Sequence, residues 1–187
     1  MSVIINTSHG SLTCQLYCEL VYNTCKNFLA LAASDYYNNT IFHRNIKGFM
    51  IQGGDPTNTG KGGENIYDIK KGFNDEFNND LKHDKRGVIS MANSGPNTNK
   101  SQFFITYNKH TSLDNKYTVF GCVVDGFEVL DKMEKEPVDI SNKKYKPLKD
   151  IILISITILS NPIAIKERDN YILELNKENS NNDNNNK

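Results

Sequence analysis

The sequence lacks three features that would each indicate a particular class of protein. Its 187 residues carry 22 Lys and Arg against 22 Asp and Glu, so the formal net charge is zero. A neutral chain has no broad positive field for general nucleic-acid or anionic-membrane binding. The longest apolar run, residues 151–159, is far shorter than the roughly 20 residues of a membrane helix. No charged start followed by an apolar stretch opens the chain, so the sequence shows no secretory signal.

Cysteine is also scarce, and its spacing excludes the common metal motifs. The four cysteines, at positions 14, 18, 25 and 122, form no C-x-x-C pair, and the four histidines, at 9, 43, 83 and 110, have no metal-ligand spacing. We therefore expect reduced core thiols in a nuclear or cytoplasmic, non-secreted protein with no metal and no cofactor. His83, within a charged stretch, is interpreted as a surface or capping residue. The absence of G-x-S-x-G argues against serine-based hydrolysis.

The composition changes near the C-terminus. From Asn176 onward, seven of the twelve residues are Asn. Such a segment cannot bury enough apolar surface to offset the entropy lost on ordering. The sequence therefore predicts one compact domain over residues 1–161, followed over 162–187 by an Asn-rich tail with a short helix and then a disordered end.

The N-terminal residues predict a β-hairpin and then a helix. Apolar and polar residues alternate over 12–18, which places Cys14 and Cys18 on one buried face of a strand. A strand at 3–6 and a turn at 8–10 complete the hairpin. Apolar residues then recur with helical spacing over 25–32.

Both predicted helices have candidate capping residues. Asn23 or Thr24 can cap the helix over 25–32. A second helix is predicted over 126–134, where Asp125 and Glu128 have the spacing of a capping box.

Short β-type segments fill most of the remaining sequence. They are residues 41–44, 49–52, 88–92, 102–106, 117–124 and 151–159. With the hairpin this gives about eight strands and two helices, a pattern typical of a closed barrel or a sandwich.

A glycine-rich stretch over residues 53–63 looks superficially like a phosphate-binding loop. Five residues separate Gly54 from Gly60, where the P-loop has four, and Lys61 is followed by Gly62 instead of Ser or Thr. We interpret this stretch as a loop that requires positive φ angles or close backbone approach.

Two blocks combine strand-forming residues with Arg and amide side chains: FHRNIKGFMIQGGD (42–55) and SMANSGPNTNKSQFFIT (90–106). With GKGGENIY (60–67), FNDEF (73–77) and YTVFGCVVDGFEVLD (117–131), they closely resemble the cyclophilin-type peptidyl-prolyl cis-trans isomerases. The resemblance covers residues 1–161. It is greatest to the small single-domain peptidyl-prolyl isomerase-like 3 subgroup, which is associated with the spliceosome.

The resemblance implies a mainly β fold, a closed eight-stranded antiparallel barrel capped by two α-helices, with a groove on its outside. It implies that Arg44 is the catalytic residue. The residues implied to bind the substrate are Phe49, Met50, Gln52, Gly60, Ala92, Asn93, Thr98, Gln102, Phe104, Leu113 and Tyr117. No metal or cofactor is implied, because rotation about a peptide bond breaks no covalent bond.

The expected function is cis-trans isomerisation of Xaa-Pro bonds in protein substrates. The alternative is a module of a spliceosomal complex that binds proline-containing segments, with incidental turnover. Two positions depart from the best-known family members: Ser112 replaces a Trp that helps to bind cyclosporin, and Tyr117 replaces a His. We therefore expect weak cyclosporin binding. The expected partners are Xaa-Pro-containing proteins, including spliceosomal proteins.

Overall fold

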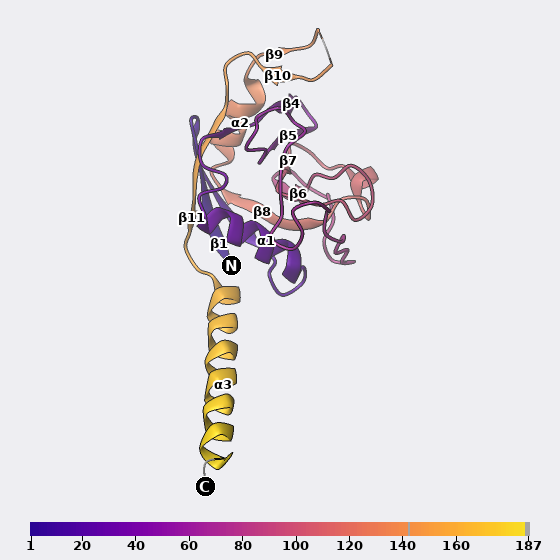
Figure 1. The fold of residues 1–187 in the computed structure, drawn as a ribbon. Coiled ribbons are helices and arrows are strands. Elements are labelled where there is room, and N and C mark those ends of the chain that lie inside the picture. Colours follow the sequence, from indigo (N-terminus) through magenta and orange to yellow (C-terminus); the bar gives the residue numbers. More distant parts are fainter. Residues whose placement is uncertain (142, 186–187) are drawn as a thin grey trace.

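The structure, a computed structural model, describes the backbone of residues 1–141 and 143–185 and the side chains of 1–141 and 143–174. Nine strands form one curled antiparallel sheet in the order β3-β11-β1-β2-β8-β6-β7-β5-β4 (Figure 1). Their bounds are β1 Ser2–Thr7, β2 Gly10–Leu16, β3 Thr40–Ile41, β4 Arg44–Ile46, β5 Met50–Gly53, β6 Val88–Met91, β7 Phe103–Thr106, β8 Val119–Asp125 and β11 Ile152–Ile158. A separate short hairpin pairs β9 Val138–Asp139 with β10 Lys146–Pro147. The predicted N-terminal hairpin is confirmed as β1 and β2.

The prediction of a barrel closed by eight strands is not confirmed. The sheet has nine strands, with β3 and β4 at its edges. The single strand predicted over 41–44 is in fact two, because β3 pairs with β11 while β4 pairs with β5. Beyond this ladder, an isolated antiparallel bridge joins Ile41 to Asp55, just after β5. The curled sheet thus brings its two edge regions together without a continuous ladder between them.

The concave side of the sheet is filled with aromatic rings. Phe28 contacts Tyr37, Phe103 and Phe120 with ring centroids 5.2–5.5 Å apart, and all four side chains are fully buried. This packing leaves no room for a ligand inside the curl. A binding site must therefore lie on the outer surface.

The two predicted helices are present, but their predicted caps are wrong. Helix α1 covers Tyr22–Ala33, and Val21 precedes it without a side-chain cap. The carboxylate of Glu76, from a distant loop, accepts the backbone N–H groups of Asn23 (3.1 Å) and Thr24 (2.7 Å) instead. A tertiary contact therefore satisfies the donors that a local cap usually serves.

Helix α2 covers Phe127–Lys135, and the predicted capping box before it does not form. Gly126 precedes the helix with a φ of 89° and no side-chain cap. A Cβ at this position would lie 2.4 Å from the carbonyl oxygen of Ser11. The close approach of β2 therefore requires a glycine where the sequence suggested a capping motif.

A third helix, α3, covers Pro162–Asn185 and projects from the domain (Figure 1). It starts at the predicted domain boundary, where the Asn161 side chain accepts the N–H of Ala164 (3.1 Å) and Ile163 is buried. Its helical backbone runs on to Asn185, further than the short helix predicted. It thus covers most of the end expected to be disordered, while residues 186–187 lie outside the described residues. The first turn of a helix is the costly step, and here the Asn161 cap and the buried Ile163 stabilise it. Each further residue then adds a backbone hydrogen bond at lower cost, so the helix can continue through a polar sequence.

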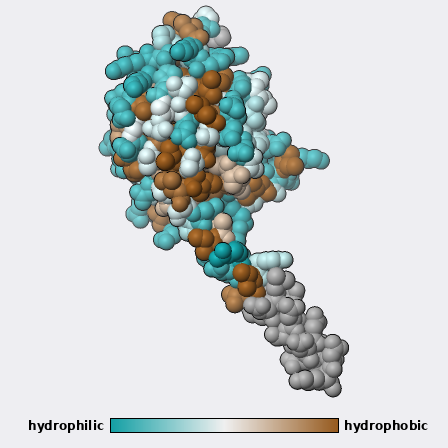
Figure 2. Space-filling view, turned by 90° about the vertical axis from the view of Figure 1, so that its left-hand side faces the viewer, coloured by the Kyte–Doolittle hydropathy of each residue, from teal (hydrophilic) through white to brown (hydrophobic). Residues whose placement is uncertain are grey.

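Apolar side chains gather on the face from which α3 leaves the domain (Figure 2). Ile154 of β11 is 46% exposed and Leu159, just after β11, is 55% exposed. No helix among the described residues is both long and apolar enough to cross a membrane. All four cysteines are free and buried, as predicted.

Candidate active site

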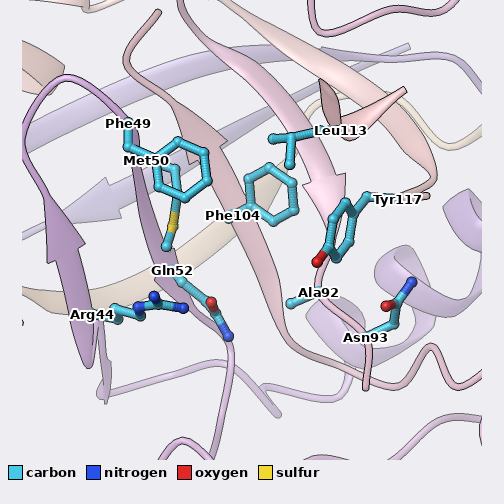
Figure 3. A pocket seen from close by; sticks show the side chains of 9 residues that line it. All are labelled: Arg44, Phe49, Met50, Gln52, Ala92, Asn93, Phe104, Leu113 and Tyr117. Atoms are coloured by element: carbon cyan, nitrogen blue, oxygen red, sulfur yellow. The ribbon is translucent and has the colours of Figure 1, made fainter. Parts of the chain in front are cut away.

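A pocket of about 170 Å³ opens on the outer face of the sheet (Figure 3). Nine of the twelve predicted site residues line it: Arg44, Phe49, Met50, Gln52, Ala92, Asn93, Phe104, Leu113 and Tyr117. These residues come from three strands and three connecting segments of the chain. The fold therefore brings both predicted blocks together in one cavity.

Strand register explains why these side chains share a face. Arg44 of β4 lies opposite Gln52 of β5, which lies opposite Phe104 of β7. Paired residues in adjacent strands project to the same side of a sheet. Their neighbours Ile51 and Phe103 project to the other side and belong to the core. The faces of these strands could not be assigned from periodicity alone.

One part of the pocket is apolar. Phe49, Met50, Phe104 and Leu113 lie together in Figure 3, and Tyr117 stands beside Phe104. The rings of Phe104 and Tyr117 meet edge to face, with centroids 5.5 Å apart. Such a cavity suits a small apolar ring.

The opposite part of the pocket is polar. Arg44 and Gln52 lie at one end of it, with the guanidinium near the amide (Figure 3). Gln52 Nε2 donates to Gln102 Oε1 (2.8 Å), and Gln102 Nε2 donates to the carbonyl of Gly62 (2.7 Å). Within the described part of the chain, no carboxylate lies within 4 Å of the Arg44 guanidinium. Its charge is therefore available to a ligand.

Three predicted residues lie outside this pocket. Gly60 and Gln102 line an adjoining hollow that shares Gln52, Ala92 and Asn93 with it. Thr98 lines neither hollow. Its hydroxyl accepts the N–H of Ser94 (2.9 Å) and donates to the carbonyl of Gly95 (2.7 Å), so it shapes the loop beside the pocket.

The interpretation of His83 as a surface residue is wrong. Its side chain is fully buried, and its ring stacks on Phe104 at 5.9 Å with an angle of 11°. Its Nδ1 lies 2.8 Å from Asp114 Oδ1, and its Nε2 lies 2.8 Å from Ser90 Oγ. Burial lowers the pKa of His83, although Asp114 partly opposes this. The neutral ring then donates to Asp114 and accepts from Ser90.

His83 also holds the loop that supplies Leu113. Asp114 Oδ1 accepts the backbone N–H of His83 (2.8 Å), and the carbonyl of His83 accepts the N–H of His110 (2.7 Å). Leu113 ends a short 3₁₀ turn, η1 Thr111–Leu113, between these two anchors. No spacing rule connects residues 83 and 114, so the sequence offered no signal for this support.

The glycine-rich loop has the positive φ angles and the close backbone approach that the sequence predicted. Asp55 is fully buried, and its carboxylate accepts backbone N–H groups from Thr57, Thr59, Gly60 and Gly62. Burial raises the pKa of Asp55, but these hydrogen bonds outweigh it, and the net shift is downward. A Cβ on Gly62 would lie 2.2 Å from the Asp55 carboxylate. The loop thus folds around its own anion, and no metal-binding cluster occurs among the described residues.

Comparisons with known proteins identify the family to which this chain belongs. The family model for cyclophilin type peptidyl-prolyl cis-trans isomerase/CLD matches residues 2–158. Two proteins named peptidyl-prolyl cis-trans isomerase-like 3 are similar over 164 residues: that of Dictyostelium discoideum is 63% identical and that of Homo sapiens 58%. Both alignments cover 88% of this chain and 99% of the relative. A crystal structure of a Cryptosporidium parvum cyclophilin type isomerase, determined in the presence of the dipeptide Ala-Pro, is 53% identical with a TM-score of 0.81, covering 86% of this chain and 100% of that one.

Proposed function

This chain belongs to the cyclophilin-type peptidyl-prolyl cis-trans isomerases, and we propose that the pocket beside Arg44 catalyses rotation about Xaa-Pro bonds of protein substrates. One observation carries the proposal: among the described residues Arg44 has no carboxylate partner, and it lines the same pocket of about 170 Å³ as a group of apolar side chains. The relative crystallised in the presence of Ala-Pro supports a proline ligand for this kind of site.

Amide resonance sets the barrier to the reaction at ~18–20 kcal/mol, and no covalent bond breaks. In the twisted state the proline nitrogen becomes pyramidal and can accept a hydrogen bond. The Arg44 guanidinium can donate to it, whereas the planar ground state offers no such acceptor. The interaction therefore stabilises the transition state selectively. Arginine suits this role because it stays charged and its donors form a rigid fork.

The rest of the groove positions the peptide. The rings around Phe104 enclose the proline, while Asn93 and Gln102 hold the backbone on one side of the rotating bond. Uncatalysed isomerisation takes tens to hundreds of seconds, so a turnover of ~10–10³ s⁻¹ requires about 4–7 kcal/mol. One charge-assisted hydrogen bond contributes about 1.5–3 kcal/mol. Positioning and desolvation in the pocket must supply the remainder.

The second candidate is a module that binds proline-containing segments of a spliceosomal assembly in the nucleus. It uses the same groove, with turnover incidental. Ser112 supports weak cyclosporin binding in either case, because a hydroxymethyl group lies next to Leu113 where many relatives offer an indole donor. The Arg44 geometry favours the enzyme, since simple binding of a planar Xaa-Pro bond needs no donor directed at the nitrogen.

Exchange NMR on a short Ala-Pro peptide tests the proposal. The native protein should accelerate cis-trans exchange, and Arg44→Ala should lower kcat/KM about 10²-fold or more, in line with loss of one preorganised transition-state donor. Arg168→Ala is the matched control, because Arg168 is exposed on α3 and pairs with Asp169. It should exchange the peptide like the native protein.

Other outcomes point elsewhere. Peptide binding without faster exchange would support the binding module. Equal turnover in the native protein and in Arg44→Ala would exclude the assigned role of Arg44 while leaving the isomerase itself intact.

A further inference from the structure

A second hollow of about 380 Å³ adjoins the Arg44 pocket. Its lining shares Asn93 and Tyr117 with that pocket, so these two side chains form the divide between the cavities. The remaining lining comes from the loop that carries Asp75 and Phe77, from residues 94–96 and from residues 115–116. It differs from the hollow beside Gly60, which lies across the Asn93–Ser94 segment.

Rings make up much of its wall. Phe77 is 48% exposed, an unusual position for an aromatic side chain in a loop otherwise rich in Asn and Asp. Pro96 and Tyr117 contribute two further rings. An exposed apolar side chain in a hollow beside a peptide site is a candidate for substrate contact.

Two polar side chains of the wall, Asp75 and Asn93, form hydrogen bonds within the protein. The carboxylate of Asp75 accepts the Asn97 N–H (2.8 Å) and the Asn99 amide (2.7 Å). The Asn93 amide donates to the carbonyl of Lys116 (3.0 Å), and its oxygen accepts the N–H of Gly95 (3.3 Å). These bonds fix the wall and leave ring surfaces to face a ligand, while the exposed Lys116 ammonium remains in water.

We propose that this hollow, the Phe77 subsite, binds a large apolar side chain of the same peptide whose proline occupies the Arg44 pocket. It would thereby set the sequence preference of the isomerase. The two cavities share a wall, and an extended chain advances about 3.3 Å per residue. The recognised side chain therefore lies within about three residues of the proline. This inference rests on the proposed function.

The test is a peptide series with a constant Ala-Pro core in otherwise alanine sequence. Leu, Phe, Asp or Lys is placed in turn at each of the three positions on either side. Leu or Phe at one position should raise kcat/KM for exchange about tenfold over the alanine peptide, the usual discrimination of a hydrophobic pocket. Asp and Lys should give no such gain.

Phe77→Ala should bring the ratio of kcat/KM for the Leu peptide to that for the alanine peptide close to one. Phe127→Ala, which removes another partly exposed ring that lines neither hollow, should keep the native ratio. Phe77→Trp retains an aromatic wall and should preserve a preference for large apolar side chains. Phe77→Trp is therefore the control that separates loss of the aromatic wall from a general structural effect of Phe77→Ala.

The outcomes separate this inference from the proposed function. If peptides are isomerised with no positional preference, if the preference survives in Phe77→Ala, or if Asp is preferred, the Phe77 subsite is wrong and the isomerase stands. If exchange is accelerated for no peptide, the proposed function fails. The dissociation constants of the same peptides then test whether the Phe77 subsite exists. Tighter binding of a Leu or Phe peptide that is lost in Phe77→Ala would still support the subsite, and equal affinities would overturn it.

Discussion

Two carboxylates in this molecule each join distant segments through two hydrogen bonds, one behind the groove and one at α3. Asp114 receives the backbone N–H and the ring Nδ1 of His83, whose side chain is fully buried. Glu167 receives the Tyr22 hydroxyl and the Lys26 ammonium, and its side chain is 42% exposed. Both carboxylates accept two hydrogen bonds, but the partner of Asp114 is buried whereas Glu167 is exposed to water.

The difference shows where the fold is rigid. In the interior, a lost partner leaves a polar group without water, which costs much more than the bond itself contributes. At the surface, water replaces a lost partner, and an ion pair contributes about 0–1 kcal/mol. The groove is therefore supported by contacts that are costly to break, and α3 is attached by contacts that are cheap to break.

Replacing His83 should produce the largest effect. His83→Phe keeps a ring against Phe104 and the backbone N–H bond to Asp114, but it removes the ring partner of the Asp114 carboxylate and of the Ser90 hydroxyl. We expect a loss of about 3 kcal/mol in the free energy of unfolding by urea, since hydrogen bonds to charged groups contribute about 1.5–3 kcal/mol. Peptide exchange should also slow, because Leu113 and Phe104 lose their support.

His110→Phe is the matched control for this substitution. His110 also lies beside the groove, where its ring contacts Phe49 and where, among the described residues, its side chain forms one hydrogen bond, to the carbonyl of Gly48 (3.1 Å). His110→Phe should lower the free energy of unfolding much less than His83→Phe does. Equal losses in the two variants would contradict the contrast between buried and exposed support.

Much of the groove could be predicted from the sequence, because its residues lie in long motifs. Nine predicted residues line one pocket, and Gly60 and Gln102 line the next. The supporting residues could not be predicted in this way. His83 meets Asp114 through a contact between residues 31 positions apart, and no local pattern encodes such a pairing.

In the fold too, local patterns predicted the elements but not the contacts between distant residues. The alternation over 12–18 predicted β2, and helical spacing predicted α1. Glu76, which caps α1, lies 52 residues after Thr24. Rules based on neighbouring residues therefore predicted the wrong cap, Asn23 or Thr24. The split of residues 41–44 into β3 and β4 depends on which neighbours each half meets, and hydrophobic periodicity carries no information on that.

A carboxylate of intermediate exposure should give an intermediate effect. Glu76 accepts two backbone N–H groups at the start of α1, as well as the Thr24 hydroxyl (2.7 Å). Glu76→Ala should cost about 1–2 kcal/mol in urea unfolding, the range for losing a helix cap. Glu64→Ala, which removes another loop carboxylate, serves as control. A loss as large in the control would show that Glu76 does not act as a cap.

Stability should also fall in mild acid. Burial lowers the pKa of His83 and of His43 below the ordinary value of about 6.5. The unfolded chain therefore binds more protons than the folded one below that pH, and stability decreases as pH falls. The slope is at most about 1.4 kcal/mol per pH unit for each group. Urea titrations at pH 7 and pH 5 measure this loss, and His83→Phe should show a smaller one. An unchanged difference in that variant would contradict a neutral buried His83.

The exposed pair should contribute little. Hydrogen bonds from Lys26 and Tyr22 lower the pKa of Glu167, so the carboxylate is charged at neutral pH. Glu167→Gln should change the unfolding free energy by less than about 1 kcal/mol, and added salt should reduce even that. A loss comparable to that of His83→Phe would show that α3 is held as firmly as the groove.

Removal of residues 168–187 should have the smallest effect of all. Beyond Glu167, no described side chain of α3 forms a hydrogen bond or ion pair with the domain, and Tyr171 and Leu173 are 61% and 57% exposed. Both alignments with the isomerase-like 3 relatives cover 99% of the relative but 88% of this chain, so part of this chain has no counterpart in them. The shortened protein keeps Ile163 and Glu167, so its urea midpoint and its peptide exchange should match those of the full chain. A slower exchange would mean that the outer part of α3 reaches the groove in solution, because the domain itself would be intact.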